Sequence, residues 1–131
     1  IPPQAGETVD DSHIARYWAQ HVDLVKSGAD AFWPDEGDWF NLFERVKLPD
    51  GKVLCPGVIT HASNIVEHPE WIAERLLRFA SLVGRENVMA GADCGFSSQA
   101  LYKTEVHPTV VWAKFKAMRA GADIASNRLW K

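Results

Sequence analysis

The 131-residue sequence lacks the features that direct a chain to a membrane, to nucleic acid or to an oxidising compartment. It has only two cysteines, Cys55 and Cys94, which excludes a disulfide framework, so we expect reduced thiols and a cytoplasmic location. No apolar run approaches the ~18–20 residues of a membrane span, so we expect no membrane partner. The 14 Lys and Arg residues are scattered among 17 Asp and Glu residues, so we expect no nucleic-acid partner.

The composition is that of an ordinary globular domain. Hydrophobic residues make up 47% and charged residues 24% of the chain. Six Trp residues are many for this length, and we expect some of them to line a groove or an interface.

Helical periodicity appears in three long segments. The first, from about residue 11, carries apolar residues at helical spacing: Ile14, Tyr17, Trp18, Val22 and Val25. The second begins at Pro69 and carries the stripe Ile72, Leu76, Phe79 and Val83. The third begins at Pro108 and carries Val111, Phe115, Met118, Ala122 and Ala125. His68, just before Pro69, is expected to cap the second helix or to pack against it.

Three apolar segments at 29–33, 53–59 and 88–92 are predicted to be strands, and a short helix is predicted around Phe43. Strands that alternate with helices predict parallel pairing. We therefore expect one α/β domain over 1–131, a partial (β/α) TIM barrel with three parallel strands. It would comprise an extended arm (1–10), a first αβ unit (11–46) and two βα units (47–131). Three strands cannot close a barrel, so we expect completion by self-association, as a homodimer.

A long set of motifs begins near Glu44 and runs to the end of the chain. It includes Leu48-Pro49-Asp50-Gly51-Lys52, Val66-Glu67-His68-Pro69-Glu70, Gly91-Ala92-Asp93-Cys94-Gly95-Phe96 and Ser126-Asn127-Arg128-Leu129-Trp130. This part resembles the C-terminal βα units of the cobalamin-independent methionine synthase-like family. The resemblance implies a barrel with a zinc ion that activates a thiol, and Cys94 matches one ligand. The family's His-x-Cys ligand pair has no counterpart here.

The segment from Leu24 to Phe40, with Phe32-Trp33-Pro34-Asp35-Glu36 at its centre, resembles glycoside hydrolase family 31. That resemblance implies that Asp35 corresponds to the nucleophile. The two resemblances meet near 43–47, which indicates a recombined, assembled or designed chain. A chance likeness in the first part is the alternative.

Working residues of parallel βα folds lie at the C-terminal ends of strands. The predicted strands end at Asp35 and Glu36, at His61, and at Asp93 and Cys94. Cys94 and His61 are zinc ligands by type, and either acidic residue of the first strand could be a third. The alternative is a vestigial thiol and a loop histidine, which we favour.

Hydrolysis of a glycoside needs a second carboxyl group opposite Asp35, and the strand that would carry it is missing. Glu36 is expected to point elsewhere, because neighbouring residues of an extended segment face opposite sides. Trp33 and Trp39 could stack on a sugar, although we favour packing. We therefore expect a non-catalytic or vestigial domain that needs no cofactor. The alternative is a zinc-dependent methyltransferase acting on a thiol, and a third interpretation is carbohydrate binding.

Overall fold

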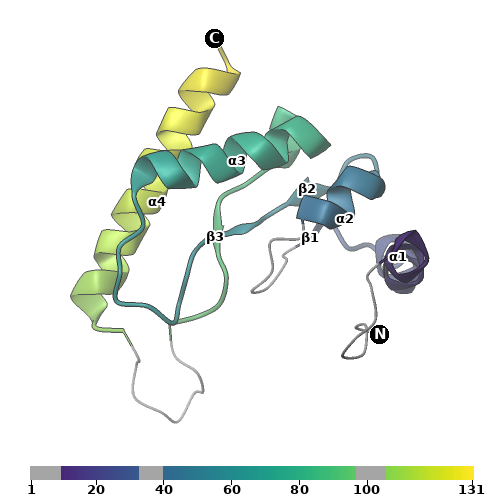
Figure 1. Cartoon of the computed structure of the whole chain (residues 1–131), viewed down its shortest axis with the longest axis horizontal. Coiled ribbons are helices and arrows are strands. Elements are labelled where there is room, and N and C mark those ends of the chain that lie inside the picture. The colour runs from purple at the N-terminus through teal and green to yellow at the C-terminus, as the bar shows by residue number, and fades with distance from the viewer. Residues whose placement is uncertain (1–9, 33–39, 97–105) are drawn as a thin grey trace.

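The computed structural model of the chain describes residues 10–32, 40–96 and 106–131. Within these ranges helices alternate with short strands (Figure 1). The helices are α1 (Asp11–Lys26), α2 (Phe40–Arg45), α3 (Pro69–Val83) and α4 (Pro108–Leu129), and a short 3-10 turn, η1, covers Arg85–Asn87. The strands are β1 (Ala31–Phe32), β2 (Val53–Leu54), β3 (Gly57–Ile59) and β4 (Gly91–Ala92). None of the helices in the described ranges has the length and apolar composition of a membrane span.

All strand pairings among the described residues are parallel, which confirms the predicted α/β class. β1 pairs with β2, and β3 pairs with β4. A single parallel bridge between Leu54 and Val88 links the two pairs. The segment 53–59 therefore lies between the other two extended segments, and the described residues form no closed barrel.

The predicted strand 53–59 is interrupted, because Pro56 has no backbone N–H to donate to a neighbouring strand. The extended chain nevertheless continues in the same direction through the break. The Cys55 N–H donates to the Phe32 carbonyl at 2.8 Å, and the Pro56 carbonyl accepts from the Gly91 N–H at 3.1 Å. The described residues therefore confirm three extended segments that run in the same direction. The regular strands within these residues are four, and they are shorter than predicted.

Each of the two long C-terminal helices begins with a histidine cap followed by proline. Nδ1 of His68 accepts a hydrogen bond from the Glu70 N–H at 3.2 Å, and Pro69 occupies the first helical turn. This confirms the capping role predicted for His68. His107 and Pro108 repeat the arrangement at the start of α4. The end of α3 is set by Gly84, whose φ of 93° favours glycine.

The N-terminal half of the chain packs around one hydrophobic core. Its buried members come from α1, α2, β2, α3 and the connection between α2 and β2: Ile14, Phe43, Leu48, Leu54 and Phe79. Trp18 lies against this core, with ring centroids 5.5 Å from Phe32 and 6.3 Å from Phe43.

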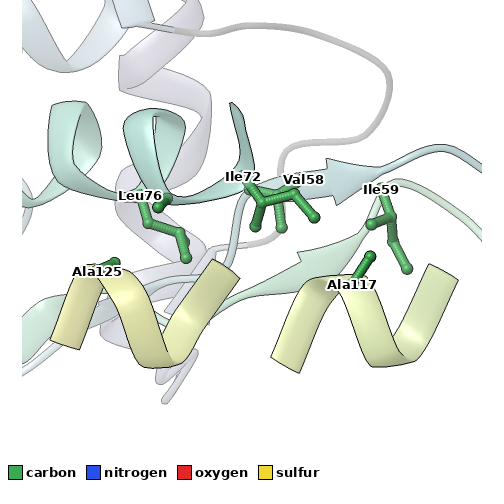
Figure 2. Close-up of a cluster of buried hydrophobic side chains, with 7 residues drawn as sticks. Val58, Ile59, Ile72, Leu76, Ala117 and Ala125 are labelled. Atoms are coloured by element: carbon green, nitrogen blue, oxygen red, sulfur yellow. The ribbon is translucent and has the colours of Figure 1, made fainter. Parts of the chain in front are cut away.

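A second core lies between α3, α4 and β3, and Figure 1 shows the two helices crossing. Its buried members include Val58, Ile59, Ile72, Leu76, Ala117 and Ala125, which in Figure 2 lie along α4, between this helix and the layer of α3 and β3. The predicted stripe of α3 faces this core or the first one, with Val83 only partly buried.

The predicted buried face of α4 was displaced by about one residue. Its most buried positions are Lys114, Ala117, Gly121 and Ala125, while Val111, Phe115, Met118 and Ala122 are only partly buried. The reason is the close approach of α3, which admits small side chains: a Cβ on Gly121 would lie 2.5 Å from Cγ2 of Ile72. The large apolar residues of α4 therefore lie beside its contact with α3, and the small residues lie at the centre of that contact.

Candidate functional site

The C-terminal ends of β3 and β4 lie side by side and bring two predicted site residues into contact. The Asp93 N–H donates to the Ile59 carbonyl at 3.0 Å, which continues the pairing beyond β4. Oδ1 of Asp93 accepts a hydrogen bond from the His61 N–H at 2.7 Å and lies 3.2 Å from Nδ1 of the His61 ring. We call Thr60, His61, Asp93 and Cys94 the rim site.

Asp93 is the electrostatic centre of the rim site. Its side chain is 14% exposed and that of His61 is 15% exposed. Burial alone would raise the pKa of Asp93, but hydrogen bonds from Thr60, from the backbone and ring of His61 and from the Cys94 N–H hold it below its usual value. The Cys94 N–H donates to Oδ1 at 2.8 Å. Asp93 is therefore held as a carboxylate.

The carboxylate also orients the imidazole of His61. Because Nδ1 faces Oδ1 of Asp93, the neutral form of the ring places its proton on Nδ1 and its lone pair on Nε2. A lone pair on Nε2 can accept a proton or bind a metal ion. The histidine predicted as a zinc ligand thus has a fixed orientation, with Asp93 as the group that fixes it.

A glycine makes this arrangement possible. A Cβ built on Gly57 would lie 2.7 Å from Cα and 2.8 Å from Cβ of Asp93. Only a residue without a side chain lets the chain after β4 lie this close to β3. The sequence Cys55-Pro56-Gly57 therefore both ends β2 and makes room for Asp93.

Cys94 follows Asp93 directly and is partly buried. It does not form a disulfide with Cys55, which lies between β2 and β3 and whose thiol pKa is raised by burial. Within the described ranges, no group of three or more His, Cys, Asp or Glu side chains lies close enough to hold a metal ion. A zinc site needs about four ligands, so the described residues do not provide a complete one.

The remaining predicted site residues, Trp33, Asp35, Glu36 and Trp39, lie outside the described residues. The proposed nucleophile Asp35 and the sugar-stacking Trp residues therefore stay predictions. The second and third predicted strands do end side by side, with His61 and Asp93 in contact. The end of the first predicted strand lies outside the described residues.

Sequence reasoning missed Thr60 in the rim site and two residues next to that site, Glu67 and Lys114. Glu67 accepts a hydrogen bond from the Thr60 N–H at 2.8 Å and forms an ion pair with Lys114. The available signal was a lysine in the first third of α4, at the start of a line of small residues (Ala117, Gly121 and Ala125). It was overlooked because lysine is ordinarily a surface residue.

Comparison with known proteins agrees with this architecture. No family model matches the sequence, and no curated protein matches it significantly. Among solved structures, a B12-independent methionine synthase from Shewanella sp. W3-18-1, in complex with selenomethionine, superimposes with a TM-score of 0.69 at 24% sequence identity. The match covers 88% of this chain and 32% of that one. The chain has the fold of part of that enzyme.

The chain thus spans about a third of the length of the methionine synthase. A match over 88% of 131 residues is longer than the 47–131 segment, so it extends into the first αβ unit. Part of the first αβ unit (11–46) therefore also matches the fold of the methionine synthase. The comparisons lend no support to the resemblance to glycoside hydrolases or to a chimeric origin.

Proposed function

We propose that the chain forms the C-terminal part of a methionine synthase-like barrel and supplies Cys94 as one ligand of a zinc site. The observation that carries the proposal is the position of Cys94, next to Asp93 at the end of β4, in a fold that matches part of a methionine synthase. The Asp93-Cys94-Gly95 motif, which resembles the ligand segment of that family, supports it.

The chemistry of such a site is thiol activation. Zinc bound there would favour the thiolate form of a substrate thiol at neutral pH, and a thiolate is the nucleophile needed to accept a methyl group. Within this chain, Asp93 would hold His61 with Nε2 available for a proton or for the metal. The reaction class is therefore methyl transfer to a thiol.

The same proposal holds that the 131-residue chain alone is not a catalyst. The described residues contain no complete ligand set, and two pairs of short strands do not enclose a substrate. We expect purified chain to contain well under one zinc ion per molecule by elemental analysis. One zinc per chain that disappears on Cys94→Ser would show a complete site and contradict this part of the proposal.

We further propose that the isolated chain self-associates as a homodimer through α4. Trp112 is 67% exposed and lies beside Phe115 with ring centroids 6.0 Å apart. Together with Ala120 and the aliphatic part of Arg119 they line an open groove along the helix. A second copy of this helix is a fitting occupant, since a two-fold contact would bury the exposed Trp112 of both copies.

A further inference from the structure

A buried ion pair connects the last helix to the loop that carries His61. The Lys114 side chain is 0% exposed and that of Glu67 is 9% exposed. Nζ of Lys114 donates to both carboxylate oxygens of Glu67, at 2.9 and 3.0 Å, and also to the carbonyl of Ile65. All three donor protons of the ammonium group thus have acceptors on one short loop.

The same carboxylate extends the connection to the rim site. Oε1 of Glu67, besides binding Lys114, accepts a hydrogen bond from the Thr60 N–H at 2.8 Å. The Thr60 hydroxyl donates to Asp93, and the next residue is His61. A continuous series of hydrogen bonds therefore runs from α4 through Glu67 and Thr60 to Asp93.

Packing alone does not explain a lysine at this position. Its neighbours on the buried line of α4, Ala117 and Gly121, are small residues that fill the contact with α3. Burying a charged pair costs desolvation energy that an apolar residue would avoid. The ion pair instead holds the loop in a defined position, because it fixes Glu67, Ile65 and Thr60 relative to α4.

We propose that Lys114 and Glu67 are positioning residues that fix the 60–67 loop so that His61 faces Asp93. The relevance of this loop to zinc and thiol chemistry rests on the proposed function. The contacts themselves do not, so the inference can be tested without metal or substrate. Failure of one claim is then distinguishable from failure of the other.

The test is amide hydrogen exchange of the full chain, followed by NMR, in Lys114→Met. The measured quantity is the exchange rate of the Thr60 and His61 amides relative to that of the amide of Phe79, a buried residue of α3. We expect this ratio to rise about tenfold or more, because the loop loses charge-assisted hydrogen bonds. The matched control is Lys116→Met, an exposed lysine on the same helix, which should leave the ratio unchanged.

A double variant, Lys114→Met with Glu67→Met, keeps the test decisive if the single variant is unfolded. It removes both charges, so no unpaired charge is left buried, while the Thr60 amide still loses its acceptor. The same rise in the exchange ratio is expected. An unchanged ratio in either folded variant would overturn the proposal. So would a double variant that does not fold, since the pair would then support the whole α3–α4 packing rather than one loop.

Discussion

The backbone N–H of His61 donates to Oδ1 of Asp93 at 2.7 Å, joining the loop after β3 to the end of β4. The contact brings an imidazole next to a carboxylate and leaves Cys94 adjacent in the chain. It also gives this edge of the parallel strands a fixed local geometry, since the same oxygen accepts from the Cys94 N–H.

The first prediction concerns the acid stability of Asp93→Asn. The pKa of Asp93 is lowered in the folded chain, so its ionised form stabilises the fold above the unfolded pKa of about 3.9. This contribution is lost as the pH falls through the folded pKa. Urea denaturation measures the free energy of unfolding at about pH 6 and about pH 3. The decrease in this free energy between the two pH values should be smaller in the variant than in the wild type. Equal losses would contradict the role of Asp93.

The second prediction concerns Gly57→Ala. The new Cβ would lie within 2.9 Å of three atoms of Asp93, two of them backbone, so the chain after β4 has to move. We expect a loss of about 1–3 kcal/mol in the free energy of unfolding by urea denaturation. The matched control is Gly95→Ala, since a Cβ there meets nothing within 4 Å. A Gly57→Ala variant as stable as this control would be inconsistent with the close approach.

The third prediction concerns the contact between α3 and α4. Ala is a better helix former than Gly by about 1 kcal/mol, so helix propensity alone predicts that Gly121→Ala stabilises the chain. A Cβ there, however, would lie 2.6 Å from Cβ of Ile72 and 2.9 Å from the Pro69 carbonyl oxygen. We expect overpacking to dominate and to reduce stability by about 1–3 kcal/mol.

The propensity term in that experiment can be measured separately. Ala113→Gly, at a half-buried position of α4 outside the groove, should lower stability by about 1 kcal/mol, mainly through propensity. If Gly121→Ala raises the urea midpoint while Ala113→Gly lowers it, propensity governs this helix and the helices do not cross as closely as described.

The fourth prediction concerns the mass of the chain in solution. Light scattering after gel filtration should give a mass near twice the 14.6 kDa of one chain, falling toward one chain on dilution. Trp112→Ser should shift this equilibrium toward the monomer. Leu24→Ser, at a 54% exposed position on α1, serves as the control and should not. A dimer that persists unchanged in Trp112→Ser would place the interface elsewhere.

Much of the fold could be predicted from periodicity. The strongly amphipathic stripe of α3 and the Pro69 and Pro108 start signals located two helices, because a long apolar face leaves few alternatives. The helix α4 was found but its buried face was misplaced, since close packing there uses Ala117 and Gly121 rather than large apolar residues. The interruption at Pro56 was visible in the sequence and was outweighed by the apolar run around it.

The rim site was predictable in part. Strand ends carry the polar groups of parallel βα folds, and that rule alone placed His61 near Asp93. It could not reveal Glu67 and Lys114, because their pairing spans 47 positions and depends on how α4 crosses the loop. Their partnership is a tertiary contact without a local signature.

The most direct test of the proposed function is the zinc content of a hybrid enzyme. In this hybrid, the chain would replace the structurally matched third of the Shewanella methionine synthase. The remaining two thirds of that enzyme would supply the strands that the described residues lack. We predict one zinc ion per hybrid molecule, lost in Cys94→Ser and retained in the control Cys55→Ser. A folded hybrid that binds no zinc, or whose zinc survives Cys94→Ser, would contradict the assignment of Cys94 as a ligand.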